Sequence, residues 1–206
     1  MKSKETRKKR QMLNKTRKNK TTYSIEDYSS NNGMLTTVWG PSAWHFLHTM
    51  SFNYPVKPTV FQKRHYMDFI QHLEHVLPCG KCRKNLKRNF KRLPLKMSDM
   101  ESRATFSLYI YRLHELVNKM LGKSSGLTYE DVRERYEHFR ARCAKPLNTP
   151  IRIVKDEKGC TESLYGEKSK CVIQIVPETT KCDTFQMDKK CVKQKLYDQA
   201  EMAATI

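Results

Sequence analysis

Two cysteines separated by two residues are the strongest candidates for chemistry in this 206-residue chain. Cys79 and Cys82 lie in the segment Pro-Cys-Gly-Lys-Cys, and a basic helix is predicted to begin at Cys79. The free N–H groups and the dipole of a helix N-terminus stabilise a thiolate, as do the nearby cations Lys81, Arg83 and Lys84. The two-residue spacing lets both sulfurs form a small, reducible disulfide that exchanges with other dithiols.

The same segment leaves two other interpretations open. His72 and His75 precede the cysteines in a His-x2-His-x3-Cys-x2-Cys pattern, whose ligand types suit zinc. That pattern lacks the long spacer usual between ligand pairs, and Pro78 interrupts the helix inside it. Two free buried thiols are the third interpretation, and the cysteine pair alone does not decide among the three.

Two further pairs of side chains share helix faces. Trp44 and His48 are four residues apart, and so are His114 and Asn118. Residues at this spacing lie one above the other on a helix. Each pair taken alone is typical of ordinary packing.

Apolar periodicity predicts the elements that position these residues. The first predicted helix begins at the Gly-Pro pair 40–41. The next three cover 60–77, run from Cys79 to Pro94 and cover 99–121, and the fifth covers 128–143. Gly122 stands where a C-terminal cap is expected, and Thr128 with Asp131 resembles an N-terminal cap. The predicted fold is all-α, a four-helix bundle with a short fifth helix over residues 34–145.

Charge is distributed unevenly along a chain whose formal net charge is +19. Ten of the first 20 residues are Lys or Arg, and eight more lie in 79–96 without an acidic residue. Such clusters attract phosphate polymers or acidic protein surfaces, although a solvated arm and a solvated helix face are the simpler interpretation. Residues 1–33 are polar and lack apolar periodicity, which predicts a basic disordered arm with weak polyanion binding as its candidate role.

Residues 146–206 are predicted to form a separate extension with irregular structure and short strands at 151–154 and 172–176. The cysteines outside the central pair are Cys143, Cys160, Cys171, Cys182 and Cys191. A structural disulfide is the favoured role for cysteines of the extension, and a shuttle pair that relays electrons to Cys79 and Cys82 is the alternative. Sequence does not choose among their pairings.

Four ordered segments of the chain resemble the Erv/ALR family of FAD-linked sulfhydryl oxidases. They are WGPSAWHFLH at 39–48, PCGKC at 78–82, LHELVNKMLGK at 113–123 and VRERY at 132–136. The resemblance covers roughly residues 34–143, the whole predicted bundle. It implies that FAD is enclosed by Trp39, Gly40, Trp44, His48, His114, Asn118, Lys123, Arg135 and Tyr136.

The resemblance also implies a reaction and partners. Protein thiols pass electrons to the Cys79–Cys82 disulfide, then to FAD and O2, which yields H2O2. Cys79 takes the mixed disulfide, and Cys82 is released as a thiolate against the flavin. Family members are commonly homodimers through their first helices.

The chain departs from the family pattern at several positions. Glu115 replaces the first Asn of the usual His-Asn-x-Val-Asn motif, and Tyr136 stands where Trp is usual. A structural cysteine found in many relatives is replaced by the segment with Ser124, Ser125 and Thr128. The N-terminal arm has no cysteine, which excludes an N-terminal shuttle disulfide within it.

Targeting signals are weak. No stretch approaches the ~20 consecutive apolar residues of a membrane-spanning helix, and the N-terminus lacks the apolar core of a secretory signal. A cytosolic or virion and viral-factory setting without a membrane is therefore expected in preference to the mitochondrial intermembrane space. Two other functional classes remain: a basic nucleic-acid-binding module with a zinc site, and a non-enzymatic protein stapled by disulfides.

Overall fold

The structure is a computed structural model, and its regular elements are helical. It describes residues 24–141, 160, 163–164, 167–168, 170, 176, 179–180 and 188–191. The chain divides into two units, Met1–Gly33 and Met34–Ile206. Within the described residues the only β pairing is an isolated antiparallel bridge between Ala141 and Ser163. The predicted all-α fold is therefore confirmed.

The first unit contains α2 (Ile25–Tyr28), a single helical turn in the arm where the sequence predicts disorder. Ser24 Oγ accepts the N–H of Asp27, and the Asp27 carboxylate accepts the N–H of Ser24. This capping box satisfies two backbone donors, so a short polar segment forms a turn without burying apolar side chains. The disorder predicted for 1–23 concerns residues outside those described.

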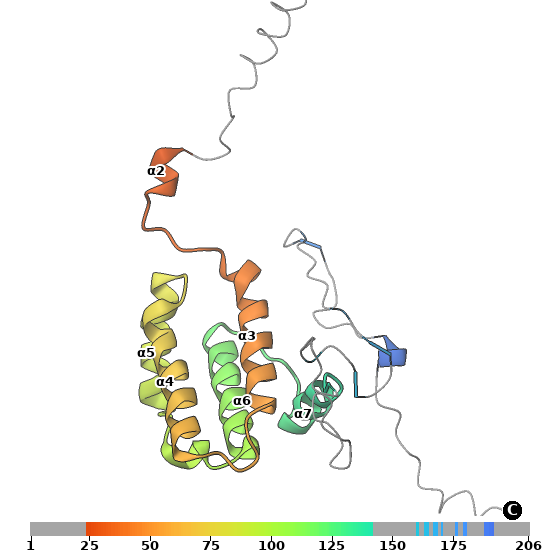
Figure 1. The fold of residues 1–206 in the computed structure, drawn as a ribbon. Coiled ribbons are helices and arrows are strands. Elements are labelled where there is room, and N and C mark those ends of the chain that lie inside the picture. The colour runs from red at the N-terminus through yellow and green to blue at the C-terminus, as the bar shows by residue number, and fades with distance from the viewer. Residues whose placement is uncertain are drawn as a thin grey trace, which may run out of the picture. The chain divides into compact units, whose positions relative to one another are not determined.

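The second unit is a helical bundle (Figure 1). Its elements are α3 (Thr36–Phe52), α4 (Val60–Val76), α5 (Gly80–Arg92), η1 (Met97–Met100), α6 (Arg103–Met120), α7 (Tyr129–Glu137) and η2 (Lys189–Cys191). Helix α3 packs on α6, α4 packs on α5, and α5 packs on α6. The short α7 packs against both α3 and α6. The result is the predicted four-helix bundle with a short fifth helix.

Helix α3 begins earlier than the sequence predicts. The Gly-Pro pair 40–41 predicts the helix start, but the helix begins at Thr36 and holds this proline in its interior. The carbonyl of Leu35 accepts the N–H groups of Val38 (3.0 Å) and Trp39 (3.3 Å), so one turn closes before the proline. The proline then removes one helical hydrogen bond without ending the helix.

Two other helix ends differ from prediction. The helix predicted from residue 99 begins at Arg103 instead, because η1 precedes it and Ser102 caps it through the N–H of Thr105. Helix α7 stops at Glu137 instead of reaching residue 143, because the chain turns and pairs through the bridge at Ala141.

The predicted caps around the last loop are confirmed. Gly122 has φ 66°, a left-handed conformation that glycine adopts without strain. Thr128 Oγ1 accepts the N–H of Asp131, whose carboxylate accepts the N–H of Thr128. These caps fix where α6 ends and where α7 begins, and α7 then packs against α3 and α6.

The bundle core is apolar, with hydrogen-bonded tyrosines at its edges. Its buried side chains are Leu47, Tyr54, Ile70, Leu86, Leu95, Met100, Phe106, Tyr109, Ile110 and Leu113. Tyr54 donates to the carbonyl of Met100 (2.9 Å), and Tyr109 donates to that of Leu93 (3.0 Å). Burial of these rings therefore leaves no phenol unpaired, which keeps their desolvation cost low.

Much of the predicted extension lies outside the described residues. This applies to the strand predicted at 151–154, to most of that at 172–176, and to Cys143, Cys171 and Cys182. Cys160 is disulfide-bonded. Among the described helices, none combines the length and the apolar character required to cross a bilayer.

Candidate active site

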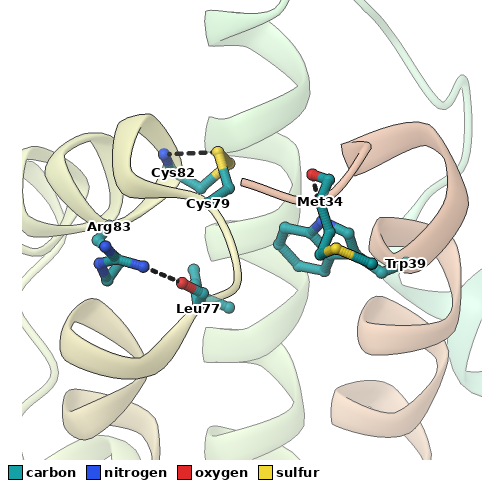
Figure 2. The surroundings of a disulfide bond; sticks show 6 residues. All are labelled: Met34, Trp39, Leu77, Cys79, Cys82 and Arg83. Atoms are coloured by element: carbon teal, nitrogen blue, oxygen red, sulfur yellow. Dashed lines mark hydrogen bonds between the residues drawn. A yellow bond between two sulfur atoms is a disulfide. The ribbon is translucent and has the colours of Figure 1, made fainter. Parts of the chain in front are cut away.

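Cys79 and Cys82 are joined by a disulfide at the start of α5 (Figure 2). Cys79 is the N-cap of α5, and its Sγ accepts the N–H of Cys82 at 3.2 Å. Their Cα atoms lie 5.1 Å apart. A sulfur at this position faces the positive end of the helix dipole, which stabilises a thiolate there when the disulfide opens.

Arg83 fixes the turn that carries the disulfide. Its Nη1 donates to the carbonyl of Leu77 at 2.5 Å, and the N–H of Cys79 donates to the same carbonyl at 2.8 Å. A Cβ added at Gly80 would lie 3.6 Å from Arg83 Nη2, so the guanidinium lies along the turn. The Arg83 side chain thus holds the end of α4 against the start of α5.

Met34 links the disulfide turn to α3. Its N–H donates to the carbonyl of Pro78 at 2.8 Å, and its own carbonyl accepts the indole N–H of Trp39 at 3.1 Å. Figure 2 shows the Trp39 ring next to Met34, on the side of the turn that carries Cys79. Two hydrogen bonds to the backbone of Met34 therefore link the predicted residue Trp39 to the turn that carries the predicted disulfide.

A cluster of aromatic and histidine rings lies between α3, α6 and α7. The Trp44 and His114 rings stack with centroids 4.0 Å apart and 9° between planes. His48 Nε2 and His114 Nδ1 share a hydrogen bond of 3.0 Å. The Tyr136 ring lies 5.3 Å from that of His48. Four of the predicted residues, from three helices, are thus brought together.

His48 and His114 of this cluster are neutral at physiological pH. Burial, with the neighbouring histidines, lowers the pKa of His48 to about 3, and burial lowers the pKa of His114 to about 4. Burial also raises the pKa of Tyr136 to about 12. In the shared hydrogen bond one neutral imidazole donates and the other accepts, so each ring has one further nitrogen available for a different partner.

One of those nitrogens is orphaned. His48 is 4% exposed, and its Nδ1 is buried without a hydrogen-bond partner among the described residues. A buried polar atom without a partner is costly, and native proteins retain few of them. Its presence beside a stacked Trp–His pair is the feature expected of a site that binds a planar, polar group.

The other predicted residues lie around this cluster. Gly40 is on α3, and a Cβ added to it would have no heavy atom within 4 Å. Asn118 Nδ2 donates to Glu115 Oε1 at 3.0 Å. The Asn118 amide is therefore bonded to the residue that departs from the family motif. Lys123 is exposed after α6, and Arg135 is half-buried on α7.

Two members of the cluster are absent from the sequence prediction. His45 Nδ1 and the Tyr136 hydroxyl are 3.2 Å apart, and the Phe52 ring stacks on Tyr136 with centroids 5.3 Å apart. Phe52 could have been found, because it continues the four-residue spacing of Trp44 and His48 along α3. The spacing along α3 does not identify His45, because this residue contacts Tyr136 on α7.

The structure also bears on the zinc alternative. Both sulfurs of the proposed ligand set are bonded to each other, so neither is available as a thiolate ligand. His72 Nδ1 lies 2.6 Å from the carbonyl of Asp68, and His75 pairs with Glu74. In the part of the chain that is described, no group of three or more His, Cys, Asp or Glu is arranged for a metal.

Fold and site together define a helical redox domain, with a disulfide at a helix N-terminus and a separate aromatic–histidine cluster. The model of the Erv1 / Alr family matches residues 41–137. A probable FAD-linked sulfhydryl oxidase, R368 of Acanthamoeba polyphaga mimivirus, is 35% identical over 104 residues, covering 50% of this chain and 72% of the relative. The chain belongs to the Erv1 / Alr family.

More distant similarity extends to yeast. The mitochondrial FAD-linked sulfhydryl oxidase ERV1 of Saccharomyces cerevisiae is 31% identical over 84 residues, which are 41% of this chain and 43% of that protein. The crystal structure of its FAD binding domain matches with a TM-score of 0.46 and 27% identity, over 50% of this chain and 95% of that one. The chain therefore spans most of its mimivirus relative but less than half of the yeast protein.

Proposed function

We propose that this protein is an FAD-dependent sulfhydryl oxidase that forms disulfide bonds in protein thiols. The observation that carries the proposal is the disulfide between Cys79 and Cys82, with Cys79 Sγ at the N-terminus of α5. This is the environment of an exchangeable redox disulfide rather than of a buried staple, because both residues are partly exposed and the thiolate is stabilised. Two relatives of this chain carry the name FAD-linked sulfhydryl oxidase, which agrees with this activity.

The residues of the aromatic–histidine cluster fit FAD. Stacked aromatic rings suit a planar ring system, and the orphaned Nδ1 of His48 would gain a partner from a bound polar group. The residues that would hold FAD are Trp39, Gly40, Trp44, His48, His114, Asn118, Lys123, Arg135 and Tyr136. When bound, FAD would supply an acceptor for the electron pair of the dithiol and a route for that pair to O2, which would be reduced to H2O2.

The protein's own step is a thiol–disulfide exchange. A substrate thiolate attacks Cys79 Sγ, a mixed disulfide forms, and the bond to Cys82 breaks so that Cys82 leaves as a thiolate. A second substrate thiolate then attacks the substrate sulfur of the mixed disulfide and releases Cys79. The substrate has lost two electrons and gained a disulfide, and Cys79 and Cys82 have been reduced to a dithiol.

The geometry at Cys79 favours this order. The sulfur that leaves in the second attack is Cys79 Sγ, and it departs with negative charge. The N–H of Cys82 and the dipole of α5 stabilise that charge, and Arg83 holds the turn that carries the sulfur. A lower thiol pKa makes a better leaving group, so release of the product is accelerated.

We also propose a homodimer through α3 and α4. Phe46 on α3 and Phe69 on α4 are 57% and 41% exposed, and their rings meet edge to face with centroids 6.2 Å apart. Val38 and Val76 on the same two helices are exposed as well. Exposed apolar side chains that contact one another, as Phe46 and Phe69 do, mark protein interfaces.

A viral or cytosolic setting is proposed from the mimivirus relative.

The experiment that tests the function is a combined cofactor and turnover measurement on the full chain. The purified protein is expected to be yellow, to consume O2 when given dithiothreitol, and to release one H2O2 for each disulfide formed. Cys79→Ser and Cys82→Ser should each abolish turnover while flavin stays bound. A colourless protein that binds zinc and DNA would instead be the basic nucleic-acid module, and a colourless protein without O2 uptake would be a disulfide-stapled structural one.

A further inference from the structure

The exposed face of α5 is a continuous basic stripe. It is formed by Lys81, Lys84, Lys87, Arg88, Lys91 and Arg92, all of which are exposed. The residues of the opposite face, including Leu86 and Asn89, are buried. The helix contains no acidic residue, and across the described residues no ion pair neutralises a member of the stripe.

Helix stability does not explain this stripe. Cations near a helix N-terminus oppose the dipole, yet Lys81 and Lys84 lie in the first turns of α5. Like charges three or four residues apart repel each other, as Lys84 does with Lys87 and Arg88. Lys91 and Arg92 in the last turn complement the dipole, but the cations of the first turns and the repulsion along the face work against the helix.

The stripe begins at the disulfide. Lys81 lies between Cys79 and Cys82 in sequence, and the stripe then follows the helix axis for about 16 Å to Arg92, at about 1.5 Å per residue. A chain segment bound along α5 would consequently bring its own neighbouring residues to the sulfur that accepts substrate. The basic charge and the redox centre belong to one element.

We propose that the basic stripe of α5 docks acidic protein segments whose thiols are then oxidised at Cys79. This rests on the proposed oxidase function and names its substrate class: dithiols flanked by Asp and Glu. A positive surface attracts acidic partners and raises their local concentration and association rate. An acidic polypeptide is favoured over a single-stranded nucleic acid because the stripe has no exposed aromatic side chain on which bases could stack, since Phe90 packs against the core.

The test compares three synthetic Cys-x-x-Cys peptides that differ only in their flanks, which are acidic, neutral or basic. At low salt the acidic peptide should be oxidised with kcat/KM about tenfold or more above the neutral one, and the preference should shrink as salt screens it. Lys87→Gln with Arg88→Gln and Lys91→Gln should abolish the preference and leave dithiothreitol oxidation unchanged. The matched control neutralises three exposed cations elsewhere, Arg64, Arg112 and Lys119, and should keep the preference.

Binding is measured separately from turnover. Fluorescence anisotropy with an acidic peptide whose cysteines are replaced by serine should show binding that the triple α5 variant loses. This readout stands even if the protein oxidises no thiol, which separates failure of the docking proposal from failure of the proposed function. Equal kcat/KM for acidic and neutral peptides, or a preference that survives the triple substitution, would overturn the docking proposal. The proposal would also be overturned if a single-stranded DNA bound tightly through the stripe while the stripe substitutions changed neither the binding nor the oxidation of the peptides.

Discussion

The indole of Trp44 lies flat on the imidazole of His114, with ring centroids 4.0 Å apart and 9° between their planes. The same imidazole shares a hydrogen bond with His48, whose remaining nitrogen is orphaned. The stack thus holds two neutral histidines in one orientation. Preorganised side chains of this kind bind a rigid planar group without first having to become ordered.

Removal of the stack should weaken flavin binding. We expect Trp44→Ala and His114→Ala each to lower FAD affinity about tenfold or more, because an aromatic contact worth roughly 1 kcal/mol or more is lost with its buried area. The measurement is flavin content and FAD titration by absorbance and fluorescence. Thr49→Ala, at an exposed position of the same helix, is the control and should bind FAD normally. Normal FAD affinity in both cluster variants would show that this cluster is not the flavin site.

The buried histidine pair should make stability depend on pH. The folded-state pKa values of His48 and His114 lie below the usual 6.5, so the folded chain binds fewer protons than the unfolded chain in acid. Stability is therefore fully present above about pH 6.5 and falls as pH drops towards 4, by up to about 1.4 kcal/mol per pH unit for each histidine. Tm measured between about pH 7 and pH 5 tests this.

Variants separate this effect from general acid denaturation. His114→Gln should flatten the loss of Tm between those pH values, although its Tm at neutral pH is lower. His75→Gln, which removes an exposed histidine, should follow the wild type. Identical pH profiles in wild type and His114→Gln would contradict the assignment of a neutral buried pair.

Sequence and structure agree best where local chemistry decides the conformation. Pro78 ends α4 and Cys79 caps α5, so the placement of the disulfide follows from a few adjacent residues. The capping box of Thr128 is local in the same way. The early start of α3 was not predictable from Pro41, because a proline permits a helix start without requiring it.

The cluster is harder to predict because it is tertiary. The bond between His48 and His114 joins residues 66 apart in the chain, and the contact of His45 with Tyr136 joins residues 91 apart. Helical periodicity places each residue on a face but does not say which faces meet. The resemblance to known family motifs supplied that pairing for Trp44, His48 and His114. It assigned no role to His45, although this residue lies within the matching segment 39–48.

Arg83 is predicted to be a positioning residue for the disulfide. In the reduced protein, Arg83→Gln should raise the thiol pKa of Cys79, because it removes a nearby cation and frees the Leu77 carbonyl. We expect kcat/KM for dithiothreitol to fall about tenfold, the equivalent of one charged hydrogen bond. The pH dependence of iodoacetamide alkylation measures the thiol pKa directly.

Two further substitutions make the Arg83 test specific. Arg83→Lys keeps the charge and should recover most of the thiolate character. Lys87→Gln removes an exposed cation farther along α5 and should leave both kcat/KM for dithiothreitol and the alkylation profile unchanged. An unaltered alkylation profile in Arg83→Gln would mean that the guanidinium does not act on the sulfur.

The apolar face of α3 and α4 should control oligomeric state. Phe46→Glu combined with Phe69→Glu places two charges where the rings meet, and we expect a monomer by size-exclusion chromatography with light scattering. Flavin content should be retained. Phe61→Glu changes an exposed ring at the start of α4, 71% exposed, and should leave a dimer intact. A wild-type protein that is monomeric at high concentration would refute the proposed interface.

The most direct test of the central claim is O2 uptake with dithiothreitol by wild type, Cys79→Ser and Cys82→Ser, all loaded with FAD. We predict rapid uptake and stoichiometric H2O2 in the wild type and none above background in either variant, with equal flavin content in all three. Wild-type turnover in either serine variant would contradict the assignment of Cys79–Cys82 as the redox disulfide.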